Sequence, residues 1–193
     1  MTAFPAPRFT IEQYLEFEKD SEIRYEYVDG YLVAMPGESP RANKIVGRLR
    51  RLLEDQFEER GYDVFTNDVK LKVSNTRIRY PDVMMVPELG DDTVPFLGRA
   101  VLTGEVVSKS SRSTDYSDKL NEYGAMPDVR YYLIVEQDRP RVSLYEFDGR
   151  GNNRYQLLEG LNATVRLPLL DGEFTLRALY GRVKFTEPSG GLN

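Results

Sequence analysis

The stretch Val-Leu-Thr-Gly-Glu-Val-Val at residues 101–107 restricts the possible folds more than any other part of this chain. A continuous apolar run of this length, without polar alternation, is typical of a β-strand that is covered on both faces. Such a strand needs a layer of structure on each side. The run therefore predicts the central strand of a mixed sheet flanked by helices, in an α/β (α+β) fold.

Local signals at the N-terminal end predict a helix followed by a hairpin. Thr10 is suited to cap a helix over residues 10–21, with Gln13 reaching back to complete a capping box. The strands expected at 25–28 and 31–34 flank Asp29-Gly30, which is the strongest short-range signal for a two-residue hairpin turn.

The rest of the chain alternates between strand and helix patterns. A long helix is expected over residues 39–60, where an apolar stripe recurs every three or four positions and Gly61 follows. A second helix is expected over 114–125, joining two strands. The expected strands cover residues 63–73, 77–86, 100–107, 130–136, 141–147, 155–158 and 163–166.

Length and composition fit one globular domain. The 193 residues, 40% of them hydrophobic, could bury roughly 70% of the unfolded surface. We expect a single domain over residues 8–185 with flexible termini at 1–7 and 186–193. No apolar run is long enough to span a membrane, and the N-terminus lacks a signal-peptide pattern, so the expected location is the cytoplasm.

The absence of cysteine and histidine restricts the available chemistry. Zero Cys excludes disulfides and thiolate nucleophiles, and zero His excludes imidazole ligands and catalytic pairs that need one. Any chemistry must then use carboxylates, Lys, Tyr, Ser or Thr. The net charge of −5 disfavours a protein that coats nucleic acid, so such binding would need a local basic patch.

Two carboxylates and a lysine are the residue types that metal-assisted phosphodiester hydrolysis needs, and this chain has a candidate set. Asp82 is followed 23 positions later by Glu105 and 14 further on by Lys119. Mg²⁺ or Mn²⁺ takes oxygen ligands, and an ammonium can position the attacking water. Asp82 could instead be a cap or turn residue, Glu105 an edge-strand charge, and Asp115 with Lys119 a solvent-exposed pair. A Glu within an apolar strand nevertheless needs a partner, which a metal or Lys119 would supply.

Four segments carry a family resemblance: RYEYVDGYLVAMP, YPDVMMV, GEVVSKSSRSTDYSDKLNEY and DVRYYLIVEQDRPRVSLYEF. They resemble, in order and spacing, the Uma-two type family of restriction endonucleases, which is similar to the PD-(D/E)xK nuclease superfamily. The resemblance covers residues 10–179 and implies a restriction-endonuclease-like mixed sheet. It also implies a magnesium- or manganese-dependent endonuclease whose substrate is nucleic acid, DNA more than RNA.

The resemblance implies roles for individual residues. Asp82 and Glu105 would bind the metal, with the main-chain carbonyl of Val106 completing the ligands, and Glu26 would be an additional acidic member. The superfamily lysine usually lies two residues after the Glu, where this chain has Val107. Its role would pass to Lys119 on the following helix.

One position departs from the family pattern. Members commonly carry a histidine just ahead of the long helix, and the matching residue is Ala42. A catalytically silent nucleic-acid-binding or protein-interaction module on the same fold is therefore the alternative. A hydrolase of sugar or nucleotide phosphates is a third possibility, because it could use the same acidic metal site.

The first half of the long helix is basic and its second half acidic, an order that opposes the helix dipole. The cations there could contact phosphates, or they could simply form a solvated face. The candidate nucleic-acid-binding residues are Arg41, Lys44, Arg48, Arg51 and Lys109. A symmetric homodimer is expected if the protein makes double-strand breaks.

Overall fold

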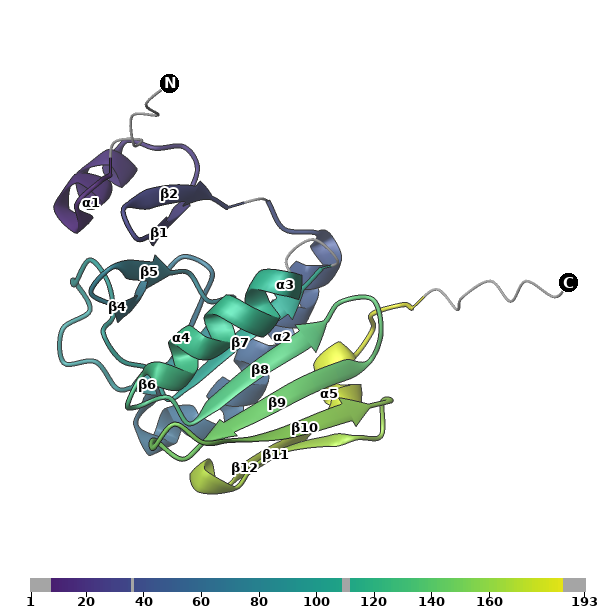
Figure 1. Ribbon diagram of the computed structural model, residues 1–193. Helices are drawn as coiled ribbons and strands as arrows, with labels where there is room; N and C mark the ends of the chain where they lie inside the picture. Colours follow the sequence, from purple (N-terminus) through teal and green to yellow (C-terminus); the bar gives the residue numbers. More distant parts are fainter. Residues whose placement is uncertain (1–7, 36, 109–111, 186–193) are drawn as a thin grey trace, which may run out of the picture.

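A six-stranded mixed sheet forms the centre of the molecule (Figure 1). The computed structural model describes residues 8–35, 37–108 and 112–185, so Lys109 and the termini that we expect to be flexible lie outside the described residues. The strand order is β10-β9-β8-β7-β6-β3, and β7 and β8 are the one parallel pair in this sheet. Its strands are β3 (Tyr62–Thr66), β6 (Val83–Pro87), β7 (Leu102–Val107), β8 (Tyr131–Glu136), β9 (Arg141–Phe147) and β10 (Asn153–Glu159).

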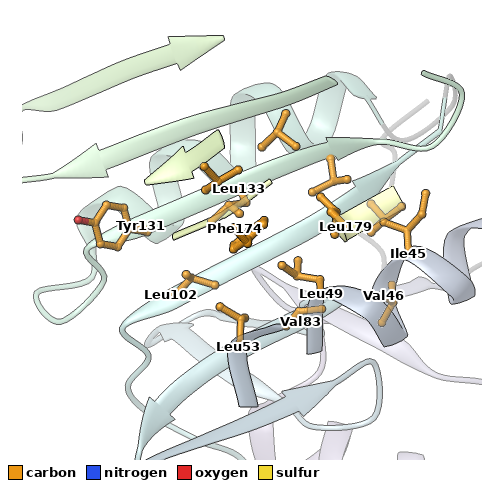
Figure 2. Packing of buried hydrophobic residues seen from close by; sticks show 14 of the residues in the cluster. Ile45, Val46, Leu49, Leu53, Val83, Leu102, Tyr131, Leu133, Phe174 and Leu179 are labelled. Carbon is orange, nitrogen blue, oxygen red and sulfur yellow. The ribbon is translucent and has the colours of Figure 1, made fainter. Parts of the chain in front are cut away.

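Layers cover both faces of this sheet, as the apolar run predicts. On one face lie α2 (Pro40–Phe57), α5 (Leu176–Tyr180) and a two-stranded sheet of β11 (Thr164–Leu167) and β12 (Gly172–Thr175). On the other face lies α4 (Leu120–Ala125) (Figure 1). Every residue of β7 and β8 is buried. Figure 2 shows Leu49 and Leu53 of α2 packed beside Leu102 of β7.

The N-terminal part forms a second sheet of four strands in the order β2-β1-β5-β4. It contains β1 (Tyr25–Val28), β2 (Tyr31–Ala34), β4 (Leu71–Ser74) and β5 (Arg77–Arg79), and it is preceded by α1 (Ile11–Lys19). The capping box between Thr10 and Gln13 is confirmed. The hairpin is also confirmed, because Asp29 and Gly30 have φ angles of 51° and 91°, as a tight turn of this kind requires.

Two expected strands are each divided between the two sheets, so those two predictions were wrong. Residues 63–73 form β3 and β4, separated by a turn in which Asn67 takes a φ of 38°. Residues 77–86 form β5 and β6, separated by Pro81, which has no amide hydrogen to continue a ladder. As a result, Asp82 lies where the chain enters the central sheet.

The helix expected at 114–125 begins earlier and is not regular. It consists of α3 (Arg112–Thr114), a π-helical turn η2 (Asp115–Lys119) and α4. Such turns are rare and are frequent at functional sites. The segment joins β7 to its parallel neighbour β8, the connection that a parallel pair needs. Short 3₁₀ turns η1 (Glu58–Arg60) and η3 (Pro168–Leu170) complete the described structure. Within it, no helix is both long enough and apolar enough to cross a membrane.

Candidate active site

Asp82 and Glu105 lie opposite each other on adjoining strands. The antiparallel register pairs Val83 of β6 with Gly104 of β7, and this places the preceding Asp82 across from Glu105. Asp82 is buried, and its Oδ2 atom accepts a hydrogen bond from the backbone amide of Val106, with 2.6 Å between the two atoms. Since β6 and β7 are held together at this point, the separation of the two carboxylates is determined by the sheet. A ligand role for the Val106 carbonyl stays a prediction.

Glu105 has two partners on the helical segment above the sheet. Its Oε1 atom accepts a hydrogen bond from the Tyr123 hydroxyl at 2.8 Å and lies 3.0 Å from Lys119 Nζ. The side chain is buried within a central strand, so the alternative of an edge-strand charge is wrong. The expectation that this Glu needs a partner is met by Lys119.

The π-helical turn directs Lys119 into a group of three carboxylates. Its Nζ atom lies 3.0 Å from Glu105, 3.3 Å from Asp115 and 3.6 Å from Glu26. Lys119 and Asp115 are 8% and 3% exposed. They are therefore not the solvent-exposed pair that their spacing also allows.

Glu26 joins the group from β1 and is fixed there by an arginine that the sequence patterns did not single out. Arg79 Nη1 donates to Glu26 Oε2 at 2.6 Å, and Arg79 also donates to both carboxylate oxygens of Glu122 at 2.7 and 2.6 Å. The Glu26 Oε1 atom is buried and has no hydrogen-bond partner. This oxygen faces Lys119 Nζ, 3.6 Å away, and can still accept a hydrogen bond there.

Burial and charge change the protonation of the group. Burial raises the pKa of Glu105 well above its usual value, although the Lys119 charge opposes the rise. Burial, and next the charge of Glu38, raise the pKa of Asp82. Burial alone would lower the pKa of Lys119, but Glu105, Glu26 and Asp115 together raise it above the usual value. Lys119 is thus a stable cation, while Asp82 and Glu105 need further positive charge to ionise fully.

A cavity of about 350 Å³ opens onto these side chains. Asp82, Glu105, Glu26 and Lys119 all line it, so the structure brings together the four predicted catalytic residues. Ala42, at the place of the family histidine, lines it too. Two further lining residues that sequence reasoning did not identify are Glu38 and Gln137.

Four of the five predicted nucleic-acid-binding residues lie along α2, outside the cavity wall. Arg41 and Arg48 are half-buried, whereas Lys44 and Arg51 are exposed. None of them contacts the carboxylate group, so the structure separates these cations from the acidic centre. Lys109 lies outside the described residues.

The donor atoms present fit a hard divalent cation. Asp82 and Glu105 offer carboxylate oxygens, and Glu26 Oε1 is a buried oxygen without a donor. Within residues 8–35, 37–108 and 112–185 no group of three or more Asp and Glu side chains is arranged so that it could hold a metal ion. Mg²⁺ does not require such a group, since it keeps several waters and usually takes one or two protein carboxylates.

Fold and site together define a restriction-endonuclease-like protein: a mixed sheet flanked by helices, with two acidic residues on adjoining strands and a lysine beside them. The chain belongs to the Uma2 family, described as "Putative restriction endonuclease", whose family model matches residues 11–178.

Two relatives and one solved structure are similar to this chain over most of its length. Two proteins of Synechocystis sp., "Uncharacterized protein sll1609" and "Uncharacterized protein slr1290", are 27% and 28% identical to this chain. The first alignment covers 83% of this chain and 93% of the relative, and the second covers 86% of each. The crystal structure of a "putative nuclease belonging to DUF820" from Anabaena variabilis superimposes with a TM-score of 0.72. It covers 89% of this chain and 97% of its own at 15% identity, and so shows that the fold is shared.

Proposed function

We propose that this chain is a magnesium- or manganese-dependent endonuclease of the PD-(D/E)xK type that hydrolyses phosphodiester bonds of nucleic acid, DNA in preference to RNA. The observation that carries the proposal is the convergence of Asp82, Glu105, Glu26 and Lys119, from separate segments, on one cavity. The family's description and the name of the Anabaena protein support the same activity. We further propose that the protein acts in the cytoplasm.

Each side chain has a role that follows from its surroundings. Asp82 and Glu105 would hold the metal, with the Val106 carbonyl as a further ligand. When bound, such a metal supplies a Lewis acid and lowers the pKa of water. Lys119 has a raised pKa, so it is a poor base near neutral pH. It would instead orient the attacking water and stabilise the negative charge that develops on the phosphate.

Glu26 would order a second water through its Oε1 atom, which lies 3.6 Å from Lys119 Nζ and accepts no hydrogen bond. Arg79 occupies the other carboxylate oxygen, so the Glu26 side chain is held with Oε1 directed to the site. Arg79 therefore acts through Glu26 and has no direct role in the chemistry.

The test is cleavage of single- and double-stranded DNA and RNA with Mg²⁺ or Mn²⁺. Metal-dependent product from the wild-type protein, and none from a folded Asp82→Ala or Glu105→Ala variant, is the expected result. Circular dichroism provides the control that each variant folds. Equal activity in the Asp82→Ala/Glu105→Ala double variant would refute the proposal.

The catalytically silent module is the second candidate, and one observation favours it. Ala42 lines the cavity, so an imidazole at this position would have reached the site, and this chain lacks that group. Binding of nucleic acid or protein that persists in chelator, with no product at any metal concentration, would support this candidate. Faster turnover of small phosphodiesters than of polymers would instead indicate the phosphate hydrolase. The homodimer stays a prediction, and sedimentation would test it.

A further inference from the structure

Six cations on α2 and just after α5 lack acidic partners. We call them the basic rim, and they are Arg41, Lys44, Arg48, Arg51, Arg182 and Lys184. In the part of the chain that the structure describes, none of the six forms an ion pair. By contrast, Arg50, on the other flank of α2, pairs with Glu54 at 2.6 Å. The rim is thus a local excess of positive charge on a chain whose net charge is −5.

The two parts of the rim are continuous. The Arg48 guanidinium lies directly over Gly181, the residue that ends α5, where an added Cβ would clash with it. Gly181 also has a φ of 46°, which disfavours a side chain. The sequence at this point therefore leaves room for the α2 cation beside the residues that follow α5.

The segment after α5 presents its cations outward. Val183 and Phe185 pack against the core on the α2 face, and the Phe185 ring contacts the Tyr180 ring with 5.3 Å between centroids. The alternating residues Arg182 and Lys184 are exposed. The two apolar side chains hold this segment against the core. Its two cations therefore face solvent from a fixed position.

Two contacts place the start of α2 and the end of α5 beside the cavity. At the start of α2, the Ser39 hydroxyl donates to Gln137 Oε1 at 2.8 Å, and both residues line the cavity. At the end of α5, the Tyr180 hydroxyl lies 2.8 Å from the carbonyl oxygen of Glu136, which precedes Gln137. The start of α2, where Arg41 lies, is therefore at the edge of the cavity, on the side where β8 ends.

We propose that the basic rim binds the phosphodiester backbone of the nucleic acid strand that leads to the cavity, and that Arg182 and Lys184 are part of this surface. That the bound nucleic acid leads to the cavity rests on the proposed function. That the rim binds nucleic acid does not. Arg41 and Arg48 are seven residues apart on α2, about 10 Å along the helix axis. This length corresponds to about three phosphates of one strand at 3.4 Å of duplex axis each.

The experiment measures binding in chelator, so that cleavage plays no part in it. Fluorescence anisotropy of a labelled DNA duplex is recorded at several salt concentrations for wild type and for Arg182→Ser/Lys184→Ser. The matched control is Arg150→Ser/Arg154→Ser, which removes one exposed cation in the β9–β10 turn and one at the start of β10. Because Glu146 of β9 pairs with Tyr131, the first residue of β8, this turn lies at the opposite end of the sheet from the cavity.

The expected result is a change in salt dependence. Each phosphate contact contributes about 0.9 to the slope of log affinity against log salt for a duplex. Losing two contacts reduces the slope by about 1.8. The ratio of wild-type affinity to variant affinity therefore falls about 12-fold between 50 and 200 mM salt. The control variant keeps the wild-type slope.

Other outcomes separate this inference from the proposed function. A rim variant whose affinity and slope equal those of the control would overturn the inference, as would a wild-type protein that binds anionic lipid vesicles but no nucleic acid. A reduced slope in a protein that cleaves nothing with any metal would support the rim and reject the nuclease.

Discussion

Replacement of Lys119 by Met should destabilise the protein in a way that depends strongly on pH. The change removes the cation that lies within 3.6 Å of Glu105, Asp115 and Glu26. At an effective dielectric constant of 20, each of these contacts carries about 5 kcal/mol of attraction before desolvation is subtracted. Without Lys119, the cluster relieves its repulsion by binding a proton.

Proton uptake by the carboxylates limits the loss in free energy of unfolding and determines whether this loss grows or falls with pH. The usual pKa of Glu105 is 4.5. Protonating a carboxyl at pH 8 therefore costs about 1.4 kcal/mol for each of roughly 3.5 pH units, or about 5 kcal/mol. The folded variant binds this proton and the unfolded chain does not, so its stability falls as pH rises above 4.5. Because the pKa of Glu105 is already raised in wild type, where Lys119 opposes the rise, this figure is the largest difference between the two proteins. We therefore expect a loss of at most about 5 kcal/mol at pH 8, and of less than about 1 kcal/mol at pH 5.

Urea denaturation of wild type and Lys119→Met between pH 5 and pH 8 measures this difference. Lys184→Met is the matched control, since it removes an exposed lysine that has no ion pair among the described residues, and its stability should equal that of wild type at every pH. A loss that does not change with pH, or that grows as pH falls, would show that Lys119 does not neutralise the carboxylates.

Two further predictions concern the same group. Arg79→Met should lower the free energy of unfolding by about 3–5 kcal/mol, because Glu26 and Glu122 lose their buried partner. Arg79→Lys should cost less, since it keeps the charge but loses the forked contact, and equal stability of Arg79→Met and wild type in urea would contradict this. Mg²⁺ should raise the melting temperature, and more at pH 8 than at pH 5, because Asp82 and Glu105 have raised pKa values and must ionise to bind it. The rise should vanish in chelator and in Glu105→Gln, and a rise that persists in Glu105→Gln would place the metal elsewhere.

Elements with short-range signals could be predicted from the sequence. The capping box at Thr10, the turn at Asp29-Gly30 and the buried strand around Glu105 are each encoded within a few residues, and all three are confirmed. The divided strands were missed for the same reason. The alternation of apolar and polar residues over 63–73 and over 77–86 fits one long strand in each range as well as two short ones. No local feature of the sequence indicates that the chain passes from one sheet to the other.

The four candidate catalytic residues could be predicted from the sequence, but the residue that holds one of them in place could not. Asp82, Glu105, Glu26 and Lys119 were identified by residue type and resemblance, and the structure brings them together. Their catalytic roles stay predictions. Arg79 was missed because its partners lie 53 positions before it and 43 after it. A weak signal did exist, since an arginine between Ile78 and Tyr80 on an expected strand needs a partner if it is buried, as Glu105 does.

The acidic net charge and a nucleic acid substrate are compatible because the charges are segregated. Four of the acids, Asp82, Glu105, Asp115 and Glu26, are buried around Lys119, where their effect on solvent is reduced by that cation and by protonation. At about 0.1 M salt, exposed charges more than about 10 Å apart are largely screened. A phosphate at the basic rim therefore responds mainly to the cations beside it. The sign of the charge near the cavity edge, and not the total of −5, decides whether a polyanion can approach.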